Sequence, residues 1–120
     1  MEMTIDVSER HPGVSVVRLS GRMGLDAESQ VQPGLLKTID QNTTGVLVDM
    51  NGVSFISSAG LRVLMIAFKQ AAATGRKVAV IRPQPEAYKM FKLANVETLF
   101  NVHETEEAAL QKFGLQTTPP

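Results

Sequence analysis

One segment, residues 45–83, constrains the fold of this chain more than any other. It begins with a short valine-rich run at 45–50 and ends with a second one within 75–83. Between these runs, apolar residues recur at helical spacing over about four turns, from 58 to 74. Short apolar runs of this kind are typical of strands covered by helices, and a helix that joins two neighbouring strands makes them parallel. The sequence therefore predicts a βαβ unit.

The N-terminal residues predict a β-hairpin. Apolar and polar side chains alternate over residues 3–8, which is the pattern of a half-buried strand. Turn-forming residues follow, and a second apolar run ends at Gly21. Two such runs separated by a short turn are typical of antiparallel neighbours.

Three further helices and one short strand complete the prediction. Asp26 and Thr105 are the expected N-caps of the first and the last of these helices. We expect helices at 25–41 (kinked at Pro33), 85–95 and 106–113, and a strand at 99–104. The fold class is thus a single α/β domain over residues 1–114, with a mixed sheet of four to five strands and about four helices, followed by a flexible tail at 115–120.

Composition excludes several functional classes. Lys+Arg and Asp+Glu each total 12, so net charge gives no reason to expect nucleic acid or an anionic membrane as a partner. The chain has no cysteine, and His11 and His103 lack ligand spacing, so neither a metal nor another cofactor is expected. No apolar run approaches the roughly 20 residues that span a bilayer, and the N-terminus lacks a signal-peptide pattern. We therefore expect a cytoplasmic protein.

Two adjacent serines, Ser57 and Ser58, stand where the first valine-rich run passes into the long helix. Serine is a favoured N-cap, worth about 1 kcal/mol, so capping is the interpretation that the residue types alone favour. Capping needs only one hydroxyl, however. The nucleophile-elbow pattern Gly-x-Ser-x-Gly, a well-placed base and a phosphate-binding loop are all missing, which disfavours an enzyme.

The pattern over residues 46–81 resembles the central segment of STAS domains, and more narrowly that of the bacterial anti-sigma factor antagonists. Weaker similarity covers residues 16–23 and 90–110, so nearly the whole chain takes part in the right order. The matching positions in the central segment are Asp49, Val53, Phe55, Ser57, Ser58, Ala59, Gly60 and Leu61.

The resemblance implies partner switching. The expected partners are an anti-sigma factor that is also a serine kinase, with a histidine-kinase-like ATPase fold, and a serine phosphatase. The position that matches the family's phosphoacceptor is Ser58, and Ser57 is the less favoured acceptor. The family often has Asp where this chain has Ser57, which is a departure from the pattern. Many members also have Asp at the position of Gly24, and here Asp26 follows two residues later. Asp49 is expected near the acceptor, with capping of a turn as the alternative role.

The helix that follows the serines offers a surface for docking. Its polar side includes Arg62, with Ile66 inside the polar arc and Val63 at its margin, an arrangement that favours contact with a protein. Alternatively, a neighbouring element covers Ile66 and solvent surrounds Arg62. The expected core stripe is Leu61, Leu64, Met65, Phe68 and Ala72. The expected partner-binding residues are Asp26, Ser57, Ala59, Gly60, Arg62, Val63 and Ile66.

A second hypothesis keeps the fold and changes the class of function. The chain would then be a scaffold, or a subunit of a non-transcriptional signalling or transport complex, in which both serines act only as helix caps. Under either hypothesis we expect a monomer or a weak dimer that has no catalytic residues of its own.

Overall fold

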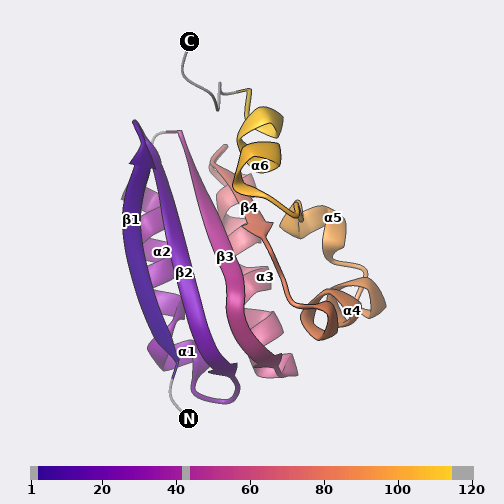
Figure 1. Cartoon of the computed structure of the whole chain (residues 1–120). Helices are drawn as coiled ribbons and strands as arrows, with labels where there is room; N and C mark the ends of the chain where they lie inside the picture. The colour runs from indigo at the N-terminus through magenta and orange to yellow at the C-terminus, as the bar shows by residue number, and fades with distance from the viewer. Residues whose placement is uncertain (1–2, 42–43, 115–120) are drawn as a thin grey trace.

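A four-stranded mixed sheet runs through the structure (Figure 1). The computed structural model describes residues 3–41 and 44–114, so the tail expected at 115–120 lies outside the described residues. In chain order the elements are β1 (Thr4–His11), β2 (Val14–Met23), α1 (Ala27–Gln30), α2 (Gln32–Gln41), β3 (Gly45–Ile56), α3 (Ser58–Ala73), β4 (Lys77–Ile81), α4 (Pro85–Leu93), α5 (Glu97–Phe100) and α6 (Glu106–Lys112).

The predicted hairpin and βαβ unit are both confirmed. β1 and β2 pair antiparallel, and β2, β3 and β4 pair in parallel, in the order β1-β2-β3-β4. Because β2 and β3 are parallel, their carboxyl ends meet at one edge of the sheet, which is the lower edge in Figure 1. α3 begins at that edge.

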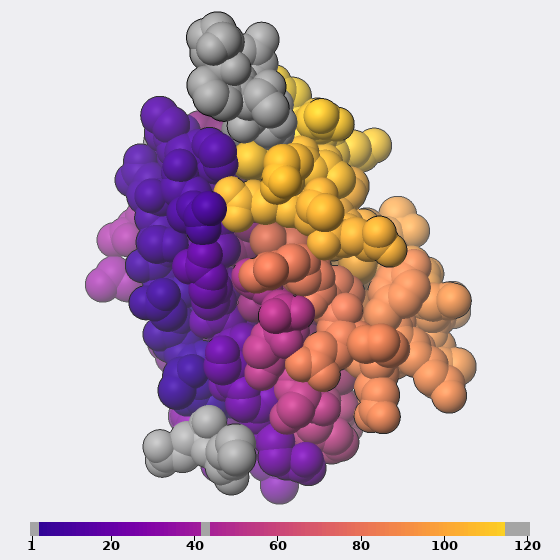
Figure 2. Space-filling model, in the orientation of Figure 1, coloured from indigo at the N-terminus to yellow at the C-terminus, as the bar shows by residue number. Residues whose placement is uncertain are grey.

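The two faces of the sheet are covered unequally. Helices α1, α2 and α3 lie behind the sheet in Figure 1 and enclose the larger core with its inner face. Phe100 of α5 stacks there against Phe68 and Phe91, with ring centroids 5.0 and 4.9 Å apart. On the front face, Leu110 of α6 and Phe113, which directly follows α6, pack on valine, leucine and isoleucine side chains from three strands. Figure 2 shows α6 in yellow over the upper part of this face, while atoms of the strands remain visible below it.

The predicted last strand at 99–104 is wrong. The chain forms the short helix α5 instead, and only His103 reaches the sheet, through a single parallel bridge to Ile81. Asn101 takes a left-handed conformation, with φ of 50°, that ends α5 and turns the chain. Asparagine tolerates this conformation better than most residues, and too few residues then remain for a strand before α6.

The predicted helix at 25–41 is divided, and Asp26 stands at the expected N-cap position of its first part, α1. The break falls at Val31, and Pro33 is the second residue of α2, where its missing N–H leaves no helical hydrogen bond unmade. Asp26 precedes α1, but its side chain makes no capping hydrogen bond. The described residues form six helices instead of about four. The two additional helices are α1 and α5, each only four residues long.

β3 is longer than the apolar run that predicts it. The run ends at Met50, yet the strand continues to Ile56. Two register shifts against β2 mark bulges, one between Asp49 and Gly52 and one between Val53 and Phe55. The extension carries the chain to the lower edge of the sheet, where the serines lie.

Among the helices of residues 3–41 and 44–114, none has the length and hydrophobicity that crossing a bilayer would require.

Candidate functional site

The candidate site forms where β2 and β3 end side by side. The carbonyl oxygen of Met23, the last residue of β2, accepts a hydrogen bond from the backbone N–H of Ser57 at 2.9 Å. It also accepts one from the Ser57 hydroxyl at 3.2 Å. These two bonds hold the start of α3 against the loop that leads from β2 into α1.

The two serines have different environments. Ser57 is the N-cap of α3: its backbone is extended, and its Oγ accepts a hydrogen bond from the N–H of Gly60 at 3.2 Å. Ser58 is the first residue of the helix, and its side chain is exposed. Within the described part of the chain no hydrogen bond to the Ser58 side chain is found. Capping therefore accounts for Ser57 and leaves Ser58 without a structural role.

Gly60 allows α3 to approach β2 closely. A Cβ atom at this position would lie 2.6 Å from the Met23 carbonyl oxygen and 2.8 Å from its Cγ, which is closer than real contacts permit. Gly60 is buried, so it does not face a partner as the sequence pattern predicted. It positions the two serines instead.

A hollow of about 340 Å³ opens beside Ser58. Val63 lies at its floor, since it lines the hollow although only 2% exposed, and Ile66 is half-buried. Asp26 is exposed in the adjoining loop but does not line the hollow. The lining residues are Leu25, Glu28, Gln32, Ser58, Ala59, Arg62, Val63 and Ile66.

Five of the residues that line this hollow are predicted from the sequence, either as partner-binding residues or as the phosphoacceptor. The other three are residues that sequence reasoning missed. Leu25 is the most informative of the three, because its side chain is 87% exposed. An apolar residue between Gly24 and Asp26, in a turn outside any periodic stripe, is the signal that could have identified it. The exposed Leu25 side chain adds apolar surface to the rim of the hollow.

Asp49 lies away from the serines. Asp49 lies seven residues before the end of β3. At the rise of an extended strand, the Cα atoms of Asp49 and Ser58 are therefore roughly 20 Å apart. The expectation that Asp49 lies near the acceptor is wrong. Its carboxylate is buried and accepts a hydrogen bond from the backbone N–H of Asn51 at 2.9 Å, which caps the first bulge of β3.

Two arginines hold the Asp49 carboxylate. Arg82 donates a hydrogen bond to Oδ2, and Arg18 Nε lies 3.9 Å from the same oxygen. This hydrogen bond, together with the negative charge of Asp49, raises the pKa of Arg82 above its usual value. Arg82 also has a left-handed backbone, with φ of 52°. The cluster ties β3 to the start of the connection between β4 and α4, which is a structural role.

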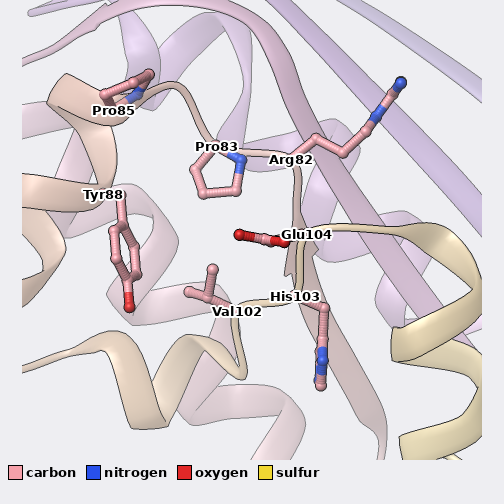
Figure 3. Close-up of a pocket in the computed structure, with 7 residues that line it drawn as sticks. All are labelled: Arg82, Pro83, Pro85, Tyr88, Val102, His103 and Glu104. Atoms are coloured by element: carbon pink, nitrogen blue, oxygen red, sulfur yellow. The ribbon is translucent and has the colours of Figure 1, made fainter.

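Another hollow, of about 420 Å³, lies between that connection and the loop before α6. Figure 3 shows Tyr88 and Glu104 directed into it, whereas Arg82 points away. Burial lowers the pKa of His103, which also lines it. None of the residues predicted to form the site contributes to this hollow. In the described ranges, no three acidic or histidine side chains converge as a metal ion would need.

The sheet order, the hairpin and the helix that starts from a capping serine define a STAS domain. The family model for the STAS domain matches residues 7–109, and the chain belongs to this family. BtrV of Bordetella bronchiseptica, provisionally named an anti-sigma factor antagonist, is 26% identical over 113 residues, which cover 94% of this chain and 95% of BtrV. The anti-sigma F factor antagonist of Paenibacillus polymyxa is 23% identical over 111 residues, which cover 92% and 94%.

Solved structures support the same fold. An anti-sigma factor antagonist from Mycobacterium paratuberculosis matches with a TM-score of 0.83 and 21% identity, over 94% of this chain and 95% of the other. Unphosphorylated SpoIIAA, an anti-sigma factor antagonist, matches with a TM-score of 0.75 and 19% identity, over 95% and 100% of the two chains. The phosphorylated form of SpoIIAA from Bacillus matches with a TM-score of 0.70 and 20% identity, over 91% and 98%.

Proposed function

We propose that this protein is a cytoplasmic anti-sigma factor antagonist that acts by partner switching. In its unphosphorylated form it binds an anti-sigma factor that is also a serine kinase, and so frees a sigma factor. Phosphorylation of Ser58 ends this binding, and a separate serine phosphatase restores it. The protein is then a substrate of both enzymes and catalyses neither reaction.

The observation that carries the proposal is the different placement of the two serines. Ser57 already caps α3, while Ser58 is exposed at the edge of a hollow with apolar and charged walls. A kinase can reach an exposed hydroxyl without unfolding the helix. The N-terminal turn of a helix also has unpaired N–H groups and a partial positive charge, which favour a phosphate there.

Modification at this place would change the surface and spare the fold. A phosphate adds about −1.5 to −2 charge and a strongly hydrated group. Against a partner carboxylate about 6 Å away, Coulomb's law gives a penalty of roughly 1–3 kcal/mol at an effective dielectric constant of 40–80. That penalty corresponds to about 5- to 150-fold in affinity, before desolvation of the phosphate is added.

Phosphorylation is tested directly with the cognate anti-sigma factor kinase and ATP, followed by mass spectrometry of the peptide that holds both serines. We expect one phosphate on Ser58 in the parent and in Ser57→Ala, and none in Ser58→Ala. Normal modification of Ser58→Ala would make Ser57 the acceptor. Absence of phosphate from all three proteins would favour the scaffold hypothesis.

The docking surface is tested with two exposed leucines that differ in position. Leu25→Glu places a charge at the hollow, and Leu93→Glu places the same charge on α4, where Leu93 is 77% exposed and lines no described hollow. We expect only Leu25→Glu to reduce affinity for the kinase, by about tenfold or more, which is the effect of about 1.4 kcal/mol. Equal affinities of the two variants would contradict docking at this hollow. Melting temperatures of both variants should stay close to that of the parent, because both side chains face solvent.

A further inference from the structure

Arg62 differs from the other arginines of this chain. Within residues 3–41 and 44–114 it has neither a carboxylate within ion-pair distance nor an aromatic ring beneath it. All the others do: Arg10 with Glu106, Arg18 with Asp6 and Asp49, Arg76 with Asp40, Arg82 with Asp49, and Arg22 with the ring of Phe55. The guanidinium of Arg62 is exposed and therefore available to a new anion.

Arg62 is also placed to reach a phosphate on Ser58. The two residues are four positions apart on α3, so they lie on the same side of the helix with Cβ atoms roughly 5–6 Å apart. Both line the hollow that Leu25 borders. The long side chain of arginine spans this separation, and its planar group matches two oxygens of a phosphate at once.

We propose that Arg62 is the intramolecular partner of the phosphoserine at position 58, an inference that rests on the proposed function. The guanidinium pairs with the phosphate oxygens across one helical turn. Phosphorylation then has two effects on the docking surface. It adds negative charge, and it withdraws the one cation of the hollow from any carboxylate on the binding partner.

Glu28 on α1 is the other charged residue that lines the hollow, and it supports this pairing. Among the described residues, no ion pair within 4.0 Å joins Glu28 to Arg62, so the arginine is not already engaged. A phosphate on Ser58 would be repelled by the Glu28 carboxylate and attracted to Arg62, so both charges favour the same orientation. The exposed carboxylate of Asp26, in the adjoining loop, adds to the repulsion.

The test uses the full chain with phosphoserine incorporated genetically at position 58, so that no kinase is needed. The second pKa of the phosphate is measured by ³¹P NMR in the phosphorylated parent and in phosphorylated Arg62→Gln. The matched control is phosphorylated Lys69→Gln, which removes a cation from nearly the same side of α3. Lys69 lies eleven residues after Ser58, or roughly 16 Å farther along the helix axis.

We expect the second pKa of the phosphate to be equal in the parent and in Lys69→Gln, and about half a unit higher in Arg62→Gln. Equal values in the parent and Arg62→Gln would overturn the pairing, and so would an equal rise in Lys69→Gln. Both substituted side chains are exposed, so folding is not at risk. If the kinase does not modify Ser58 yet this pKa difference is found, the proposed function fails and the pairing stands. If the kinase modifies Ser58 but the parent and Arg62→Gln have equal pKa values, the proposed function stands and the pairing fails.

Discussion

Replacing each of the two adjacent serines by alanine should have very different effects on stability. Ser57→Ala removes the hydroxyl that accepts the Gly60 N–H at 3.2 Å and donates to the Met23 carbonyl at 3.2 Å. Loss of an N-cap costs about 0.5–2 kcal/mol. The Met23 carbonyl keeps its bond from the Ser57 backbone N–H, so the second lost bond adds little. We therefore expect Ser57→Ala to lower the free energy of unfolding by about 1–2 kcal/mol.

Ser58→Ala should change the free energy of unfolding by less than about 0.5 kcal/mol, because the side chain is exposed and alanine is the better helix former. Urea-induced equilibrium unfolding measures both variants. Far-UV circular dichroism is the suitable signal, since the chain has no tryptophan. The predicted loss for Ser57→Ala corresponds to a fall in melting temperature of about 3–6 °C per kcal/mol. A loss for Ser58→Ala as large as that for Ser57→Ala would refute the assignment of the cap.

Three further predictions concern packing, the buried carboxylate and pH. Gly60→Ala should lower the free energy of unfolding by about 1–3 kcal/mol in urea, because its Cβ would lie 2.6 Å from the carbonyl oxygen of Met23, whereas Gly24→Ala, with open space around it, should be nearly neutral. Asp49→Ala should lower the free energy of unfolding by roughly 1–3 kcal/mol in the same measurement, because the Asn51 N–H and Arg82 lose their acceptor and Arg18 loses an ion-pair partner; a neutral result would contradict the structural role. Burial holds the pKa of His103 below 6.5 in the folded chain, so the unfolded chain binds more protons and stability falls as pH drops through and below 6.5. His103→Gln should reduce that fall, and an unchanged pH dependence would contradict the shift.

The sequence predicts the centre of this fold well because two signals agree there. Valine-rich runs and a helical stripe of four turns specify β3, α3 and β4 without reference to the rest of the chain. Thr105 as the cap of α6 is confirmed for a similar local reason, since its hydroxyl accepts the N–H of Ala108 at 3.0 Å. These features depend on residues that are close in sequence.

The failed predictions around β3 depend on contacts between distant residues. The second half of β3 contains Asn51, Gly52 and Ser54, which interrupt the apolar pattern, and pairing with β2 keeps it extended nevertheless. The expectation that Asp49 lies near the serines comes from the family resemblance, and the continuation of β3 to Ile56 separates the two. The actual partner of Asp49, Arg82, is 33 positions away in the sequence. Leu25 was missed for the same reason, since only the parallel pairing of β2 and β3 brings it beside Ser58.

The division of roles between the serines also explains a departure from the family pattern. The resemblance to the family implies Asp in many members at the position of Ser57, and aspartate and serine are both strong N-caps. The substitution therefore keeps the hydrogen bond to the Gly60 N–H that starts α3. A phosphate on Ser57 would replace the proton that its half-buried Oγ donates to the Met23 carbonyl and would crowd the same oxygen where it accepts the Gly60 N–H, whereas a phosphate on Ser58 would disturb neither bond. Under the proposed function, the capping residue preserves the shape that the partner recognises, and its neighbour is free to be modified. For this reason we favour Ser58 over Ser57 as the acceptor.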